Sequence, residues 1–268
     1  MDTIKIAVAG AAGRMGTSIV RCARDLDEVQ IAGAYERPGH PDIGKDAGDL
    51  SGIAALGLPV ADTVATCAGC DALIDFTFHT AAPDSARFAA ENGLSLILGT
   101  TGLTDDEASS VREATASVPV VWAPNMGLGV NLLFALVRQA AAVVGLDYDA
   151  EIVETHHRHK QDAPSGTALR LAENLAAGRK QDLDTEACYG RHGIIGERPH
   201  GQIGIHSVRS GDVVGEHTVS FATDGERIEL THKASSRDIF AKGALRAALW
   251  AYGRAPGLYD MPDVLGLS

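Results

Sequence analysis

The sequence lacks an excess of positive charge. It holds 23 Lys and Arg residues against 35 Asp and Glu residues, so its formal net charge is -12. Nucleic-acid binding depends on a basic surface, and this balance therefore argues against a nucleic-acid partner. The sequence also lacks an apolar run near the roughly 20 residues that cross a membrane, and Met1–Thr3 leads into an apolar strand without a signal-peptide pattern. We therefore expect a cytoplasmic protein with no membrane partner.

Cysteine is scarce as well, with four residues in the chain. Cys67 and Cys70 form a C-x-x-C pair, which could be redox-active or half of a zinc site. No second pair accompanies it and the residues around it are small, so we interpret both thiols as structural. Free thiols fit a reducing compartment.

The chain begins with a β-α-β pattern around a glycine-rich turn. Ile4–Ala9 is an apolar strand, Gly10–Gly16 carries G-x-x-G-x-x-G, a helix follows, and Val29–Tyr35 is a second strand. Such glycines permit a tight turn and let a pyrophosphate approach the helix start, although the spacing departs from the stricter G-x-G-x-x-G. Glu36 could bind the ribose hydroxyls of NAD and Arg37 the 2′-phosphate of NADP, which predicts tolerance of either cofactor. The alternative is a surface Glu-Arg pair at a strand end.

Strand and helix patterns alternate up to about residue 122, which predicts a parallel, doubly wound sheet. Ligands bind at the carboxyl ends of the strands in such sheets. The ends predicted here are small or polar, as a nicotinamide cleft requires: Gly10–Gly16, Glu36-Arg37, Asp75–Thr77, Gly99–Thr101 and Ala123–Met126. Residues 38–66 are interpreted as a long connection with weak local structure.

The most unusual stretch runs from Glu154 to Thr167. Its residues His156–Lys160 are all basic or can become so, in an acidic chain, which indicates either an anionic ligand or an acidic partner surface. A strand over Tyr148–Thr155 precedes the cluster and a helix beginning near Ser165 follows it. Because a helix start offers unpaired N–H groups, the arrangement suits a small dianion that also needs a proton.

Two other interpretations of this stretch stay open. A solvated basic turn would give it no ligand. A zinc site would use His156, His157 and His159, but adjacent imidazoles on a strand point apart, and Arg158 and Lys160 would repel a cation.

The last third of the chain changes to a period of two. Strands over 203–209, 213–222 and 227–232, separated by turn signals, predict an antiparallel meander whose open face meets another subunit. Residues 178–200 are interpreted as a loop. A helix over Ser236–Tyr252 is expected to return to the first domain.

Together these motifs resemble the 4-hydroxy-tetrahydrodipicolinate reductase family, also called dihydrodipicolinate reductases, over essentially the whole chain. The block Glu154–Thr167 is highly specific, whereas a Rossmann glycine turn is not. The other stretches that carry the resemblance are Val8–Gly16, Asp75–Thr77, Gly99–Gly102 and Thr231–Arg237.

The resemblance implies a fold and a reaction. The fold class is α/β: a Rossmann-type doubly wound parallel sheet in a dinucleotide-binding domain, 1–127 and 238–268, plus an α+β substrate-binding and tetramerisation domain, 128–237, with a mixed, largely antiparallel sheet. The reaction is NAD(P)H-dependent reduction of the cyclic dianion 4-hydroxy-tetrahydrodipicolinate to tetrahydrodipicolinate with loss of water, in lysine and diaminopimelate biosynthesis. The implied cofactor is NADH or NADPH, the implied assembly is a homotetramer, and no metal is expected.

The resemblance also implies residue roles. His156 and Lys160 are the catalytic pair. The substrate carboxylates are held by His157, Lys160, Gly166 and Thr167. The cofactor is bound by Gly10, Ala11, Ala12, Gly13, Arg14, Met15, Glu36, Arg37, Gly99, Thr100, Thr101, Ala123, Pro124, Asn125 and Met126.

The chain departs from the family pattern at three places. Phe78 stands where some members have Arg, Leu103 where many have Phe, and Pro124–Gly127 where they often have A-N-F-S. These positions bear on the nicotinamide wall and on cofactor preference rather than on the reaction class.

Three other functions remain open from the sequence. The first is another NAD(P)H-dependent reductase, acting on a different imine or keto acid. The second is a non-catalytic NADPH-binding sensor, which would leave the His156–Lys160 cluster unexplained. The third is a zinc hydrolase, which purified protein with stoichiometric metal would support.

Overall fold

The computed structural model describes residues 3–267, which fall into two compact units. The first unit holds the chain up to Leu128 and again from Asp238, and the second holds Gly129–Arg237. The helix predicted near the carboxyl end of the chain returns to the first unit, as expected.

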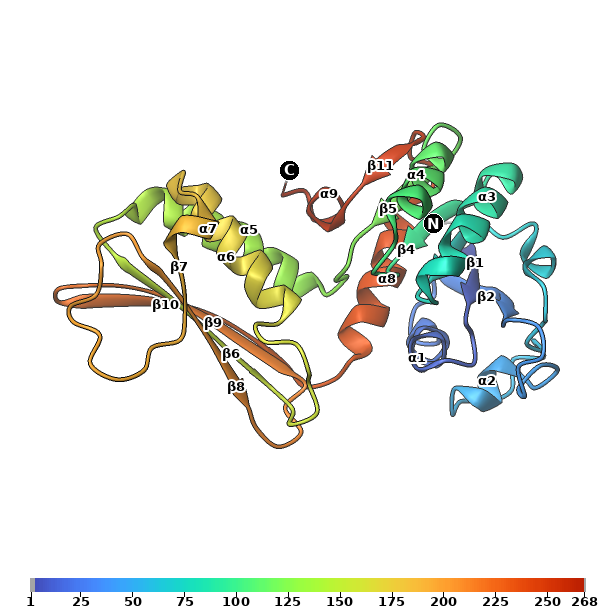
Figure 1. Ribbon diagram of the computed structural model, residues 1–268. Helices are drawn as coiled ribbons and strands as arrows, with labels where there is room; N and C mark the ends of the chain where they lie inside the picture. Colours follow the sequence, from blue (N-terminus) through green and yellow to red (C-terminus); the bar gives the residue numbers. More distant parts are fainter. Residues whose placement is uncertain (1–2, 268) are drawn as a thin grey trace. The chain divides into compact units, whose positions relative to one another are not determined.

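The first unit is built on a six-stranded sheet whose strand order is β11-β5-β4-β3-β1-β2 (Figure 1). Every pairing in it is parallel. The strands are β1 (Ile4–Ala9), β2 (Val29–Tyr35), β3 (Ala72–Asp75), β4 (Ser95–Leu98), β5 (Pro119–Trp122) and β11 (Gly257–Tyr259). The expected doubly wound parallel sheet is therefore confirmed, and β11 is an addition that the sequence pattern did not indicate.

Helices cover both faces of this sheet because its side chains are apolar on both sides. Ile6 and Val8 of β1 pack in one core with α1 (Arg14–Ala23) and α8 (Asp238–Ala251). Ala7 and Ala9 face a second core with α3 (Ala82–Asn92) and α4 (Asp105–Ala114). The remaining elements of this unit are α2 (Ala47–Leu50), α9 (Met261–Leu265) and the 3-10 helices η1 (Val64–Cys67) and η2 (His79–Ala81).

The second unit places helices against a mixed sheet of order β10-β9-β6-β8-β7 (Figure 1). The strands are β6 (Asp149–His156), β7 (Ala187–Tyr189), β8 (Ile203–Arg209), β9 (Gly215–Thr223) and β10 (Glu226–Ala234). The helices are α5 (Leu128–Val144), α6 (Gly166–Arg179) and α7 (Leu183–Glu186). Residues of α5 and α6 share one core with β6, β8 and β9.

The predicted meander is wrong in its order. β9 and β10 form the expected antiparallel hairpin, but β8 pairs with β6 in parallel, and β6 lies between β8 and β9. Ile152 of β6 supplies the physical reason, since it is fully buried with Ile205 of β8 on one side and Val219 of β9 on the other. An apolar strand gains more from a central position than from an edge.

Two segments interpreted as irregular contain regular structure. Residues 38–66 include α2 and most of η1, and Asp46 caps α2 by accepting hydrogen bonds from the Gly48 and Asp49 N–H groups. Residues 178–200 include α7 and β7, where β7 extends the sheet by pairing with β8. Neither segment has enough apolar periodicity to reveal these short elements.

No helix among residues 3–267 is long and apolar enough to cross a membrane.

Candidate active site

The end of β6 carries the polar side chains at the centre of the candidate site. Burial alternates along this strand, so Ile152, Glu154 and His156 all lie on the face that α5 and α6 cover. The neighbouring strands bring their own polar residues to the same face: Ser207 of β8 pairs with Glu154, and Arg209 pairs with His156. The same face of β6 is therefore apolar in the middle of the strand and polar, but still buried, at its carboxyl end.

Glu154 is completely buried and both its oxygens are bound. Its Oε2 lies 2.5 Å from His156 Nδ1. Arg209 donates to both oxygens in a fork, at 2.9 and 3.0 Å, and the Ser165 N–H donates to Oε1 at 3.2 Å. Burial alone would raise the pKa of Glu154, but hydrogen bonds from Arg209, His156 and Ser207 outweigh it and lower the pKa to about 2.

His217 of β9 packs against His156. The two rings meet edge to face with centroids 5.1 Å apart, and Nε2 of His217 is 3.1 Å from the Ser165 hydroxyl oxygen. That oxygen also accepts from the Ala168 N–H and so caps α6. Burial and the nearby His156 lower the pKa of His217 to about 4, so this ring is neutral at physiological pH.

The loop after β6 separates the histidines that are adjacent in sequence. His156 points to the buried face, whereas His157 lies outside the strand, with its ring 6.2 Å from that of His159. Nδ1 of His157 is buried without a hydrogen-bond partner among the described residues. Burial lowers the pKa of His157, and the positive charge of Arg237 lowers it further.

Lys160 and the start of α6 complete this part of the chain. The Lys160 Nζ atom lies 2.8 Å from Asp162 Oδ1, and its side chain is 21% exposed. Gly166, the first residue of α6, is exposed, and a Cβ built on it would meet no atom within 4 Å. The helix start therefore borders open space, while Thr167 in the next position is half-buried.

The glycine turn of the first unit has the geometry that a dinucleotide requires. Gly10 has a φ of +65°, which favours glycine, and a Cβ on Gly16 would lie 2.1 Å from the Gly10 carbonyl oxygen. No side chain caps α1, and no acidic residue lies in its first turn. The α1 start can therefore accept a pyrophosphate, and the residues present fit a dinucleotide.

The other predicted cofactor residues follow neighbouring strands and so share one edge of the sheet. Glu36 is half-buried, and one of its carboxylate oxygens lies 3.8 Å from where a Gly10 Cβ would stand, whereas Arg37 is exposed. The predicted positions after β4 and β5 are Gly99, Thr100, Thr101, Ala123, Pro124, Asn125 and Met126. Of these, Thr100, Ala123 and Met126 are buried.

A buried carboxylate ties these loops together. Asp75, at the end of β3, is fully buried and its Oδ1 accepts from the N–H and hydroxyl of Thr77 and from the hydroxyl of Thr100. Phe76 covers Gly99 so closely that a Cβ there would lie 2.2 Å from the ring. Asp75 therefore sets the positions of the loops after β3 and β4.

Comparison with known proteins identifies the family. The family pattern described as "Dihydrodipicolinate reductase, N-terminus" matches residues 4–126, and the one described as "Dihydrodipicolinate reductase, C-terminus" matches residues 129–265. The chain belongs to the dihydrodipicolinate reductase family. The predicted resemblance is thereby confirmed.

Relatives in this family match along nearly the whole length. The 4-hydroxy-tetrahydrodipicolinate reductase of Anaeromyxobacter dehalogenans (strain 2CP-C) is 55% identical over 98% of both chains. That of Citrifermentans bemidjiense is 48% identical over 98% of this chain and 99% of its own. A dipicolinate-bound dihydrodipicolinate reductase from Paenisporosarcina sp. TG-14 has the same fold, with a TM-score of 0.74 at 23% identity over 97% of this chain and 98% of that chain.

The sequence patterns did not indicate Arg209 and His217 as part of this site, and they gave Glu154 no role. Glu154 had a signal, because it is an acid at an apolar position of an alternating strand. Arg209 and His217 had none that could be used, since their contact with His156 depends on which strands flank β6.

The cysteine and histidine side chains of residues 3–267 are not arranged as a metal site. All four cysteines are free thiols, and burial raises the pKa of Cys67 to about 12. Within residues 3–267, no group of three or more His, Cys, Asp or Glu side chains is arranged to hold a metal ion.

Proposed function

We propose that the chain catalyses the NAD(P)H-dependent reduction of 4-hydroxy-tetrahydrodipicolinate to tetrahydrodipicolinate in lysine and diaminopimelate biosynthesis. Membership of the dihydrodipicolinate reductase family carries this conclusion. The overall reaction consumes the substrate, NAD(P)H and one proton, and releases tetrahydrodipicolinate, NAD(P)+ and water. The protein must therefore bind a cyclic dicarboxylate, hold a dinucleotide and supply a proton.

We assign the substrate to the loop after β6 and the start of α6. His157, Lys160, Gly166 and Thr167 bind its carboxylates. Three observations support this assignment: the concentration of cationic groups at 156–160, the open space in front of Gly166, and the buried, unpaired Nδ1 of His157. An unpaired buried nitrogen is costly unless a ligand pairs with it.

We assign proton transfer to His156 and Lys160. The imidazole of His156 lies at the end of β6, and an imidazole can act as a general acid or base. The ammonium group of Lys160 can donate a proton or bind a carboxylate. Its ion pair with Asp162 holds the side chain close to the loop that follows β6. Loss of water from the substrate gives a conjugated C=N–C=C system, and the proton that balances hydride addition comes from one of these two groups.

We assign the cofactor to the glycine turn and the neighbouring strand ends. Gly10–Met15 would hold the pyrophosphate, Glu36 and Arg37 the adenosine ribose or its phosphate, and Gly99–Thr101 with Ala123–Met126 the nicotinamide side. A reduced nicotinamide supplies the hydride when bound. The uncapped start of α1 supports the pyrophosphate assignment.

We propose that the enzyme is a cytoplasmic homotetramer, assembled through the sheet of the second unit. Val153 and Val208 are exposed on the face of this sheet opposite the α5–α6 core, at 39% and 43% of their full exposure. Exposed apolar side chains on a sheet face are typical of a contact with another subunit.

The test of the activity is oxidation of NADH and NADPH, measured separately by absorbance, on substrate freshly made by condensing pyruvate with aspartate semialdehyde. We expect rapid oxidation with at least one cofactor and none without the substrate. Tight cofactor binding with no oxidation would keep the fold and overturn the activity, leaving another imine or keto-acid reductase or an NADPH sensor.

A further inference from the structure

A buried carboxylate stands directly behind the proposed catalytic imidazole. Glu154 is two residues before His156 on β6, its side chain is fully buried, and its Oε2 lies 2.5 Å from His156 Nδ1. Both atoms are on the same face of the sheet because side chains alternate along a strand. The contact is therefore fixed by the strand itself.

The carboxylate is held so that it cannot turn away. The Arg209 fork binds both its oxygens at 2.9 and 3.0 Å, and the Ser165 N–H binds Oε1 at 3.2 Å. Arg209 is itself tied to the Asp162 carbonyl oxygen at 2.6 Å. Three segments of the chain thus hold one carboxylate beside one ring nitrogen.

The opposite edge of the imidazole faces a glycine. A Cβ built on Gly215 of β9 would lie 3.0 Å from His156 Nε2, tighter than an ordinary contact. The absence of a side chain at this position leaves room for the ring where it stands. Since Glu154 engages Nδ1, proton exchange falls to Nε2.

We propose that Glu154 is a positioning residue for the reaction: it fixes His156 with the proton on Nδ1, leaves Nε2 as the exchanging atom, and stabilises the imidazolium. The proposal rests on the proposed function. When Nε2 of the imidazolium gives its proton to the reduced substrate, the neutral ring keeps its Nδ1–H bond to Glu154, and solvent later restores the proton at Nε2.

Charges from every neighbouring element act on this ring. The carboxylate of Glu154 favours the imidazolium, and the guanidinium of Arg209 opposes it. The other titratable or charged groups nearby are His217 on β9 and His157, Lys160 and Asp162 in the loop. His217 adds no charge at neutral pH because burial lowers its pKa to about 4.

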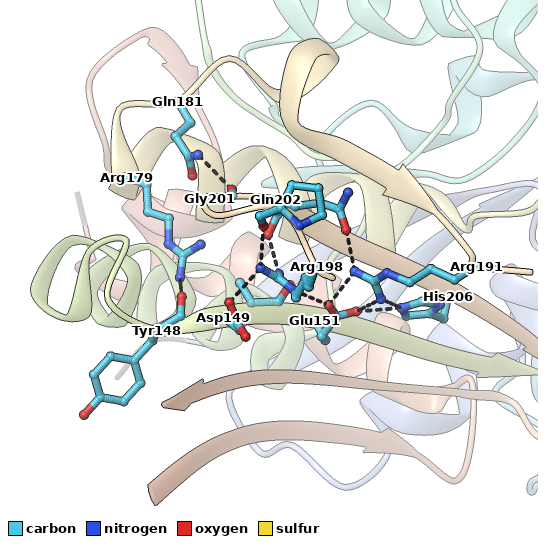
Figure 2. A network of polar contacts seen from close by, with 12 residues as sticks. Tyr148, Asp149, Glu151, Arg179, Gln181, Arg191, Arg198, Gly201, Gln202 and His206 are labelled. Carbon is cyan, nitrogen blue, oxygen red and sulfur yellow. Dashed lines mark hydrogen bonds and ion pairs between the residues drawn. The ribbon is translucent and has the colours of Figure 1, made fainter. Parts of the chain in front are cut away.

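The same strand offers a matched control. Glu151 lies on the opposite face of β6 and is also bound by arginine and imidazole side chains, here two arginines and one imidazole, with Arg191 at 2.8 and 2.9 Å, Arg198 at 3.0 Å and His206 at 2.7 Å (Figure 2). Burial would raise the pKa of Glu151, but these hydrogen bonds lower it to about 2. Glu151 matches Glu154 in chemistry but does not touch His156, so it separates a structural role from positioning.

The test compares three variants by their kcat and kcat/KM profiles from about pH 5 to about pH 9. In Glu154→Gln we expect kcat to fall about 10-fold or more and KM to change less than about 3-fold. The limb of the pH profile that reflects protonation of His156 should move about one pH unit lower. Arg209→Gln should move that limb higher, because it removes a cation while the carboxylate remains. Glu151→Gln should not move it.

Opposite shifts in the first two variants support the proposal, because a merely structural carboxylate would lower activity equally at every pH. Unmoved limbs, or the same shift in all three variants, would overturn it.

A second readout does not depend on turnover or on a variant that folds. Long-range 15N NMR of the wild-type protein should show His156, above its titration, with the proton on Nδ1. Protonation on Nε2 would overturn the proposal even if the enzyme is active. Conversely, a wild-type protein that shows the Nδ1 proton but does not reduce the substrate would overturn the proposed function while the positioning contact stands.

Discussion

His156 and Lys160 are close in sequence but lie in different surroundings. His156 is buried at the end of β6, in contact with Glu154 and His217. Lys160 is partly exposed in the loop and paired with Asp162. A buried imidazole with a fixed carboxylate suits proton exchange, and a flexible ammonium suits both proton donation and carboxylate binding.

Replacement of either residue should reduce the chemical step. We expect Lys160→Ala and His156→Ala each to lower kcat by about 10²-fold or more, typical of a lost acid-base group. Steady-state NAD(P)H oxidation measures the effect, with Lys180→Ala at the end of α6 as a control for the loss of a lysine. Near wild-type rates in both variants would show that the proton comes from elsewhere.

The residues after β2 should set the choice of cofactor. We expect Glu36→Ala to weaken NADH binding more than NADPH binding, because a carboxylate accepts from both ribose hydroxyls, and Arg37→Ala to do the reverse. Each effect should be on the order of 10-fold, as expected for one charged hydrogen bond. Fluorescence titration with each cofactor provides the measurement, and equal losses for both cofactors in both variants would contradict the assignment.

At the scale of the elements, the glycine turn depends on close contact between α1 and β1. A Cβ on Gly16 would lie 2.1 Å from the Gly10 carbonyl oxygen and 2.7 Å from Ala11 Cα, and neither atom belongs to a flexible side chain. The helix must therefore move outward if this glycine is replaced.

We expect Gly16→Ala to lower the free energy of unfolding by about 1–3 kcal/mol, the usual cost of overpacking, and to weaken NAD(P)H binding. Gly13→Ala is the graded comparison, since its Cβ would lie 3.1 Å from the same oxygen. Urea unfolding and cofactor titration give the two readouts. A Gly16→Ala protein with wild-type stability would show that the helix start is not packed as described.

The two ion-paired glutamates of β6, Glu154 buried and Glu151 half-buried, should make the fold sensitive to acid. Glu151 and Glu154 both have a pKa of about 2 in the folded protein, below the roughly 4.3 of an unperturbed Glu. A lowered folded pKa contributes stability that is present above the unfolded value and is lost as pH falls through the folded one. Stability should therefore decline between about pH 4.5 and about pH 2.

Each carboxylate should contribute on the order of 2 kcal/mol to this decline. Urea unfolding at a series of pH values measures it in the wild type and in Glu151→Gln, in which the side chain no longer titrates. The variant should be less stable near neutrality and show a shallower decline in acid. An identical acid slope in both proteins would mean that other groups govern acid unfolding.

At the scale of the whole molecule, the apolar residues on the open face of the second sheet are the basis for the proposed tetramer. Val208 of β8 is 43% exposed there, whereas Val143 of α5 is 85% exposed on a helix. A cation at an apolar subunit contact must lose its hydration, while the same change at a solvated site costs little.

We therefore expect Val208→Lys to shift the protein to smaller species and Val143→Lys to leave its mass unchanged. Size-exclusion chromatography with light scattering reports the mass of each, and circular dichroism checks that both remain folded. A folded Val208→Lys protein with the wild-type mass would place the subunit contact on another face.

Local patterns in the sequence determined much of this protein. The glycine turn, the alternation of strands and helices up to β5, and the cluster that follows β6 are each encoded within a short stretch, through turn geometry, period and charge. Ser165 as the cap of α6 was likewise predictable, because a cap and its helix are adjacent in sequence.

The tertiary structure alone decided what surrounds His156. Arg209 reaches Glu154 across 55 positions of sequence, and it does so because β8 pairs with β6 in parallel rather than with β9 as a meander would have it. Period-two patterns say which face a side chain takes but not which strand lies beside it. The sequence of β6 thus contains the imidazole and the carboxylate. The strand order, which burial of β6 in the middle of its sheet sets, brings the arginine of β8 and the histidine of β9 next to them.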